Sequence, residues 1–214
     1  MGKAFIITLG FDSSVVLRAI SKHGINSNDQ IILITSTTPH PKAENAINET
    51  VKFIGKIEKN ITVETLRVEE HDFTKTVRTI YNKIGNLKKR KREIIIDISG
   101  GPRIIGLASY VAAGLNGIHT VNITTETQSR NIALPVIVDP IEIQKPTPRQ
   151  LELLKTLPAR PSDIARKMHI TRSAVSKMIK TLAKKGLIER KGKTITPNKK
   201  GELILKISQK PSIL

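Results

Sequence analysis

The chain has 214 residues, which is enough for one ordinary domain and a smaller second one. It carries 36 lysines and arginines against 18 acidic residues, a formal net charge of +18 that favours a polyanionic partner. It contains no cysteine, which excludes disulfides, thiolate catalysis and cysteine-ligated zinc, and no apolar stretch approaches the roughly 20 residues that cross a bilayer.

Most of the excess positive charge lies in the last third of the chain. Up to Gln144 there are 18 basic and 14 acidic residues, a net charge of +4, and after it 18 basic and 4 acidic residues, a net charge of +14. No amphipathic membrane helix is evident, so nucleic acid is a better candidate partner than a lipid surface. Residues 1–3 lead into a strand-like run without a signal-peptide pattern, and we expect a cytoplasmic location.

Strand and helix patterns alternate through the first two thirds of the sequence. β-Branched and alternating runs predict strands over residues 3–9, 31–35, 61–68, 93–98 and 118–124, followed by an antiparallel strand over 132–138. Helical apolar spacing predicts four helices. The first begins at residue 15 after a cap at Asp12 or Ser13, the second ends at about residue 59, the third covers 72–84, and the fourth ends near Leu115. The alternation predicts an α/β fold, a Rossmann-like doubly wound and mainly parallel sheet.

The run over residues 92–106 holds the strongest candidate site. A buried strand ends there in a short polar turn before helical spacing resumes. The pair Gly100–Gly101 allows positive φ and close approach to the backbone, and Pro102 suits a first helical position. With the N–H groups of the helix start, the Ser99 hydroxyl and the Arg103 guanidinium, the turn predicts a phosphate site without a catalytic group. Alternatively, the glycines only reverse the chain.

A second polar turn follows the first strand, at residues 10–14. If the strand order is 3-2-1-4-5, strands one and four are neighbours, and ligands of such sheets bind beyond the carboxyl ends of the strands at this switch point. We therefore expect the turns at Gly10 and at Gly100–Gly101 to share one crevice. Neither turn has the G-x-G-x-x-G spacing, so NAD binding is not expected.

A run of five basic residues, Lys88 to Arg92, precedes the fourth strand. It lies at the amino end of that strand, opposite the crevice, and we do not expect it to contact a ligand there. A solvated loop is its simplest interpretation, and an auxiliary contact with a polyanion is the alternative.

A second domain follows a proline-bounded linker at residues 140–146. The sequence thus predicts a ligand-binding domain over 1–139 and a smaller domain over 147–214. The elements expected in the smaller domain are helices over 147–157, from 162 and over 171–185, a hairpin over 187–196 and a terminal helix over 199–207. This order is typical of a winged helix-turn-helix domain, and the terminal helix is available for dimer packing.

The third helix of that domain presents a polar, cationic face opposite an apolar one. Such a face suits the major groove of double-stranded DNA, and a basic hairpin tip suits phosphates. The predicted DNA-binding residues are Thr171, Arg172, Ser173, Ser176, Lys177 and Lys180 on the helix, and Arg190, Lys191 and Lys193 on the hairpin. The alternative is a winged helix used only for protein contacts.

Catalytic and metal-binding patterns are missing from the sequence. The five histidines (23, 40, 71, 119 and 169) lack metal-ligand spacing, and there is no G-x-S-x-G motif or Walker lysine. We expect no metal and no cofactor. Asp12 and Asp97 follow two strands and leave an enzymatic use of the crevice open, although a helix cap and a turn-organising role explain them more simply.

The sequence resembles a known family in two motifs. Residues 6–12 (Ile-Ile-Thr-Leu-Gly-Phe-Asp) and 97–104 (Asp-Ile-Ser-Gly-Gly-Pro-Arg-Ile), followed by a winged helix, are similar to the CRISPR-associated Rossmann-fold (CARF) transcriptional regulators of archaea. The resemblance implies a homodimer that regulates CRISPR-Cas loci and binds a cyclic oligoadenylate, most simply the tetra-adenylate, in a cleft across the two-fold axis.

The resemblance also implies the ligand-binding residues. Gly10, Phe11, Asp12 and Ser13 match the first ligand loop of the family, and Ser99, Gly100, Gly101, Pro102 and Arg103 match the second, while Thr35, Ser36, Thr37 and Thr38 are added from topology. Some relatives cleave their cyclic ligand with a lysine or polar residue near the second motif, where this chain has Arg103. We therefore expect a regulator rather than an enzyme. The alternatives are a ring nuclease and a regulator that senses an ordinary nucleotide.

Overall fold

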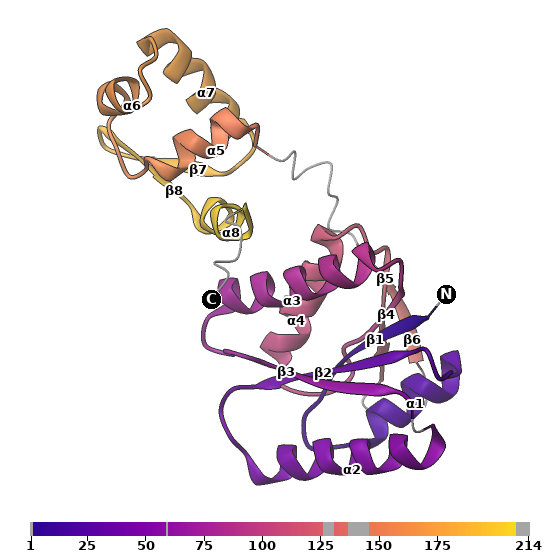
Figure 1. The fold of residues 1–214 in the computed structure, drawn as a ribbon. Coiled ribbons are helices and arrows are strands. Elements are labelled where there is room, and N and C mark those ends of the chain that lie inside the picture. Colours follow the sequence, from indigo (N-terminus) through magenta and orange to yellow (C-terminus); the bar gives the residue numbers. More distant parts are fainter. Residues whose placement is uncertain (1, 59, 126–130, 137–145, 209–214) are drawn as a thin grey trace. The chain divides into compact units, whose positions relative to one another are not determined.

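The computed structural model describes residues 2–58, 60–125, 131–136 and 146–208, and its chain divides into two compact units, Met1–Pro140 and Ile141–Leu214 (Figure 1). Most of the linker expected at 140–146 lies outside the described residues. Within the described part, no helix is long and apolar enough to pass through a membrane.

The first unit is built on a six-stranded sheet with the order β3-β2-β1-β4-β5-β6. Its strands are β1 (Lys3–Thr8), β2 (Gln30–Ser36), β3 (Thr62–Val68), β4 (Glu93–Asp97), β5 (Thr120–Thr124) and β6 (Asn131–Pro135). All neighbours pair in parallel except β5 and β6, which are antiparallel. The order 3-2-1-4-5, on which the shared crevice depends, is the one observed. The returning antiparallel last strand is confirmed, and the fold is the Rossmann-like sheet that the alternation indicated.

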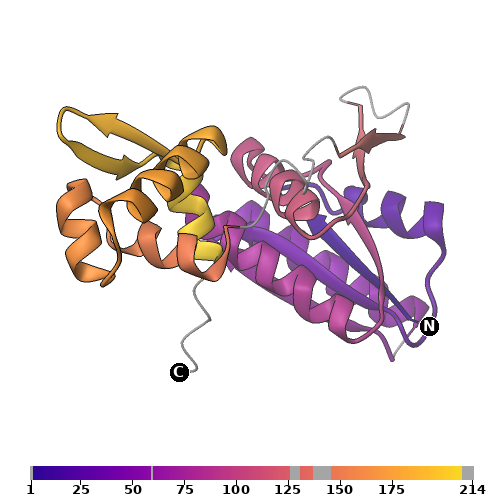
Figure 2. The same cartoon turned by 90° about the horizontal axis from the view of Figure 1, so that it is seen from above.

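Helices cover both faces of this sheet (Figure 1). They are α1 (Ser14–His23), α2 (Pro41–Ile57), α3 (Phe73–Lys89) and α4 (Arg103–Leu115). In Figure 1, α1 and α2 lie on one face and α3 and α4 on the other, and Figure 2 shows α3 and α4 side by side. Strand β1 is buried on both faces, so its residues from Ala4 to Thr8 are at most 1% exposed, which explains its unbroken apolar run. The side chains of Phe5, Ile7 and Leu9 pack in one cluster with α1 and α2.

Helix α3 is longer than the predicted 72–84. Its apolar face continues through Ile84 to Leu87, both buried, so the helix runs on to Lys89. The first two residues of the basic run thus form the last helical turn, where cations interact favourably with the helix dipole. Arg92 instead donates to the backbone carbonyls of Lys3 and Asn28, at 3.2 and 2.6 Å. Two of the five residues of the run are therefore helical rather than loop, and the last one, Arg92, joins β4 to its neighbours.

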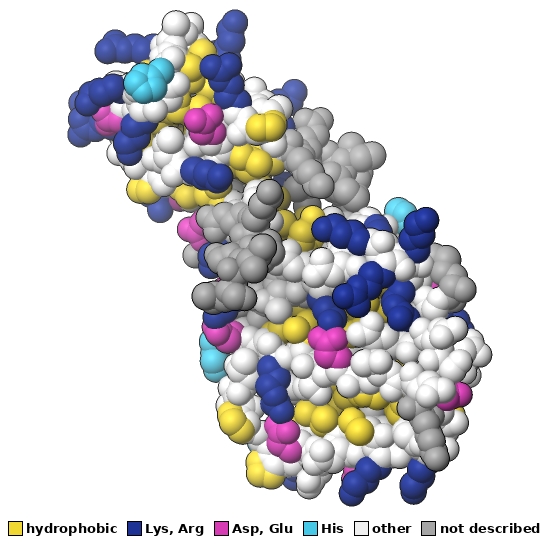
Figure 3. Space-filling model, viewed as in Figure 1, with side chains coloured by type: hydrophobic (Ala, Val, Ile, Leu, Met, Phe, Trp, Pro, Cys, Tyr) yellow, Lys and Arg dark blue, Asp and Glu magenta, His cyan; other side chains and the backbone are white. Residues whose placement is uncertain are grey.

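The second unit is a winged helix-turn-helix domain. Its elements are α5 (Pro148–Lys155), α6 (Pro161–Lys167), α7 (Arg172–Lys184), β7 (Ile188–Lys191), β8 (Thr194–Pro197) and α8 (Lys199–Ser208). A single apolar cluster joins the helices to the antiparallel β7–β8 wing, with Leu153, Ile164, Val175 and Ile195 almost completely buried. Among the charged side chains on the visible face of this unit, most are Lys and Arg (Figure 3).

Caps and prolines fix where these helices begin. Thr147 and Gln150 form a reciprocal capping box on α5, and the Thr171 hydroxyl accepts from the Ala174 N–H at the start of α7. Helix α6 begins at Pro161, one residue earlier than predicted, because proline suits the first helical position. Helix α8 packs so closely that a Cβ on Gly201 would lie 2.1 Å from the Leu187 carbonyl oxygen.

Candidate functional site

The two glycine turns that follow β1 and β4 touch each other. A Cβ added to Gly10 would lie 2.9 Å from the Gly101 nitrogen, and one added to Gly100 would lie 2.5 Å from the Thr8 carbonyl oxygen. Gly101 also has a φ of 76°, which favours glycine. Because the contact is between backbones, neither turn tolerates a larger residue at these positions. The shared crevice expected from the strand order is present at the carboxyl ends of β1 and β4.

Helix α4 opens onto this crevice without a side-chain cap. Pro102 is the N-cap residue, with an extended ψ of 135°, and not the first helical residue as predicted, so the helix begins at Arg103. The uncapped first turn leaves backbone donors and the positive end of the helix dipole facing outward. Arg103 is exposed. The turn thus combines features that suit an anion.

The Ser99 hydroxyl is used inside the protein. It donates to the Asp97 carboxylate and accepts from the Thr124 N–H at 2.7 Å, which ties the turn to β5. Asp97, 2% exposed, also accepts from the Ser99 N–H at 2.9 Å. These two residues therefore organise the turn, and the Asp-x-Ser spacing is the sequence signal for this closed loop.

Replacing Asp97 by alanine is expected to destabilise the protein by about 1 to 3 kcal/mol, because it leaves the partly buried Ser99 N–H without its acceptor. Urea unfolding measures the loss. The control is Glu44→Ala, which removes an exposed partner of Arg67, 2.8 Å away, and should cost less than about 1 kcal/mol. An Asp97 variant as stable as this control would contradict the organising role.

The first turn is held by Asp12. Its carboxylate accepts from the Ser14 N–H at 2.9 Å and from the Ser14 hydroxyl at 2.6 Å, and Arg18 lies 3.6 Å away. The Ser14 hydroxyl bond is the main cause of an Asp12 pKa below the usual value, with the Ser14 N–H and Arg18 adding to it. Ser13 is the N-cap residue of α1 but makes no side-chain cap bond, and its hydroxyl donates to Glu49 at 2.8 Å.

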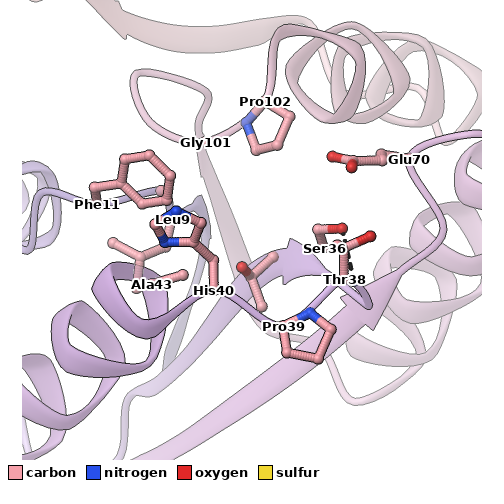
Figure 4. A pocket seen from close by; sticks show the side chains of 12 residues that line it. Leu9, Phe11, Ser36, Thr38, Pro39, His40, Ala43, Glu70, Gly101 and Pro102 are labelled. Atoms are coloured by element: carbon pink, nitrogen blue, oxygen red, sulfur yellow. Dashed lines mark hydrogen bonds between the residues drawn. The ribbon is translucent and has the colours of Figure 1, made fainter.

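A cavity of about 370 Å³ adjoins the two turns (Figure 4). Its wall is mostly apolar, and its lining residues are Leu9, Gly10, Phe11, Thr35, Ser36, Thr38, Pro39, His40, Ala43, Glu70, Gly101 and Pro102. The structure thus brings together seven of the residues that the sequence analysis named for the ligand. The other six do not line this cavity: Asp12, Ser13, Thr37, Ser99, Gly100 and Arg103.

Five lining residues were missed by sequence reasoning: Leu9, Pro39, His40, Ala43 and Glu70. Leu9, Pro39 and His40 lie in the loops after β1 and β2, which already held candidates, and Ala43 lies in the first turn of α2. Extending each candidate loop by a few residues would have found them. Glu70 follows β3, the edge strand, and its sequence surroundings carry no comparable signal.

Two aromatic side chains form one wall of the cavity. Phe11 and His40 stack with ring centroids 4.3 Å apart and an interplanar angle of 29°. His40 is the N-cap of α2, where its Nδ1 accepts from the Lys42 N–H at 3.2 Å. Phe11 stays 61% exposed although it packs on His40. Phe11 therefore keeps surface open beside the cavity.

The predicted DNA-binding side chains are exposed together on the second unit. Every residue named on α7 is exposed, as are Arg190, Lys191 and Lys193 on the wing. Lys191 pairs with Glu189 at 3.0 Å. The buried Val175 and Leu182 hold the opposite face of α7 in the core, so its polar face points outward.

These features define a Rossmann-like domain with a switch-point crevice, followed by a winged-helix domain. The chain belongs to the family described as the Csa3 CRISPR-associated Rossmann-like domain, whose model matches residues 3–135. Residues 147–194 match the MarR family. The resemblance found in the sequence is thereby confirmed, and the combination with a MarR-type DNA-binding domain indicates a CRISPR-associated regulator.

Comparison with solved structures gives similarities at low identity. Protein VC1899 from Vibrio cholerae has 13% identity and a TM-score of 0.44 over 96% of this chain. Enterococcus italicus Csm6 bound to cyclic hexa-2'-fluoro-hexa-dAMP has 12% identity and a TM-score of 0.46 over 85% of this chain. A type III CRISPR defence DNA nuclease activated by cyclic oligoadenylate has 14% identity and a TM-score of 0.46 over 97% of this chain. The chain spans 66%, 49% and 33% of these three chains respectively. No curated protein matched the sequence.

Proposed function

We propose that this protein is a transcriptional regulator of CRISPR-Cas loci that binds a cyclic oligoadenylate at the crevice between β1 and β4 and double-stranded DNA through α7 and the wing. The observation that carries the proposal is the backbone contact between Gly10 and Gly101 beside an open cavity. It gathers both glycine turns into one site at the switch point of the sheet, where ligands of this fold class bind.

The chemistry of the turns supports a phosphate-bearing ligand. The uncapped start of α4 offers backbone donors, and the exposed Arg103 guanidinium offers a planar fork that suits phosphate oxygens. None of these groups needs to react with the ligand. Asp12 and Asp97 each bond within their own loop, which favours a binding site over a ring-opening enzyme.

A homodimer fits the proposal. Two copies related by a two-fold axis would present four glycine turns to a symmetric ring of phosphates, and two α7 helices to DNA half-sites roughly 34 Å apart. The ligand would then regulate DNA binding by favouring one placement of the two winged helices, and DNA would change ligand affinity by the same factor.

Replacing Arg103 by alanine is expected to weaken binding of cyclic tetra-adenylate by roughly tenfold or more, since it removes a charge-assisted phosphate contact. Calorimetric titration of the purified protein measures the affinity. Lys89→Ala is the control, because this cation lies at the end of α3, before the amino end of β4. DNA binding without ligand should be unchanged in both variants, and an unchanged ligand affinity in the Arg103 variant would contradict the proposed site.

A further inference from the structure

Among the described residues, the cavity beside the glycine turns has the wrong chemistry for phosphate. Its wall is made mostly of apolar groups from Leu9, Pro39, Ala43 and Pro102, and its charged lining group is the carboxylate of Glu70. A carboxylate accepts hydrogen bonds only and repels phosphate oxygens. A volume of about 370 Å³ is in the range of small-molecule sites. The cavity therefore suits a flat, largely apolar group that carries hydrogen-bond donors on its edge.

We infer that this cavity receives an adenine base of the ligand, with the Phe11–His40 stack as its aromatic wall and Glu70 as the acceptor for the exocyclic amine. The inference rests on the proposed function and assigns the base-recognition part of the same site. The phosphates would stay at the edge of the cavity, at the backbone of the glycine turns and at Arg103, so each part of the ligand meets the chemistry that suits it.

The aromatic wall is anchored through His40. The ring of His40 is fixed as the N-cap of α2, and its Nδ1 acceptor role places the proton of the neutral ring on Nε2. Phe11 lies against this ring at 4.3 Å and still exposes most of its surface. Stacking on aromatic side chains is a common mode of base binding because every base has a π-face.

Glu70 supplies the selective group. In Figure 4 its carboxylate lies across the cavity from Phe11 and His40 and points into it. The Glu70 side chain is 24% exposed. Its Oε1 lies 3.7 Å from Nε2 of His71, whose side chain is 89% exposed. The half-buried carboxylate thus gains most from a ligand that donates to it. The 6-amino group of adenine is such a donor.

Binding of two cyclic tetranucleotides to the full chain tests this assignment. One is cyclic tetra-adenylate, and the other carries purine in place of each adenine and so lacks only the 6-amino group. The wild type, Glu70→Ala, Phe11→Ala and Glu69→Ala are compared by calorimetric titration. Glu69 is the matched control, because its carboxylate pairs with Lys75 rather than facing the cavity.

The wild type and the Glu69 variant should prefer the adenine ligand by tenfold or more. In the Glu70 variant this preference should fall to about one, since only the adenine ligand loses a partner. Phe11→Ala should weaken both ligands by a similar factor, roughly tenfold. A wild type without preference, or a Glu70 variant that keeps it, would overturn the inference while leaving the proposed function intact.

A wild type that binds neither ring would instead overturn the proposed function. The base site is then judged by NMR titration with adenosine 5'-monophosphate and purine riboside 5'-monophosphate. A preference for the adenine nucleotide that Glu70→Ala abolishes would support the base site in the absence of a cyclic ligand. Equal binding of the two nucleotides, or none, would overturn it.

Discussion

Alanine in place of Gly100 is expected to abolish binding of cyclic tetra-adenylate and to lower the free energy of unfolding by about 1 to 3 kcal/mol. The added Cβ would lie 2.5 Å from the Thr8 carbonyl oxygen and 3.2 Å from the Val15 Cγ2 atom. The first of these atoms belongs to the backbone of a buried strand and cannot move aside. The turn after β4 must shift instead and lose its contact with the turn after β1. Urea unfolding and calorimetric titration measure the two effects.

Gly55→Ala is the control for this substitution. Gly55 lies within α2, and nothing would come within 4 Å of an added Cβ there. Alanine at this helical position is expected to raise stability by about 0.5 to 1 kcal/mol and to leave ligand binding unchanged. If Gly100→Ala behaved like this control, the close backbone contact would not be needed for the site.

Removing three cations from α7 is expected to have the second large effect. Arg172→Ala, Lys177→Ala and Lys180→Ala together should lower affinity for double-stranded DNA, and each lost phosphate contact should reduce the slope of log affinity against log salt by about 0.9. All three side chains are exposed, so folding should be unaffected. Fluorescence anisotropy of labelled DNA at several salt concentrations gives the slope.

The control here is Lys155→Ala, an exposed cation on α5 outside the predicted DNA-binding face. It should retain most of the DNA affinity and nearly the full salt slope. DNA binding by the wild type that does not vary with salt would rule out phosphate contacts. A triple variant with the wild-type slope would show that any DNA contact lies elsewhere on the chain.

The arrangement of the sheet could be predicted from the sequence because its central strands are buried on both faces. The apolar runs of β1, β2 and β4 have no polar alternation, which is typical of parallel strands between helix layers. The strand order then placed Gly10 beside Gly101. Local signals also sufficed for the start of α7, where the Thr171 cap is explicit.

Other details depend on contacts between segments far apart in the sequence. The Ser99 hydroxyl looked available to a ligand, but Thr124 from β5 donates to it. Pro102 suited a first helical position, yet its extended ψ of 135° makes it the N-cap. Glu70 reaches the cavity only because β3 lies beside β2 in the sheet. No pattern within a single segment contains these relations.

The backbone contact between Gly10 and Gly101 also has a mechanical consequence. The turn at Gly10 leads into α1, and the turn at Gly101 leads into α4, on the opposite side of the sheet. Because the two turns abut without intervening side chains, neither can be displaced alone. A ligand bound at this contact would therefore displace the starts of α1 and α4 together. One binding event would thus be transmitted to the helices on both faces of the sheet.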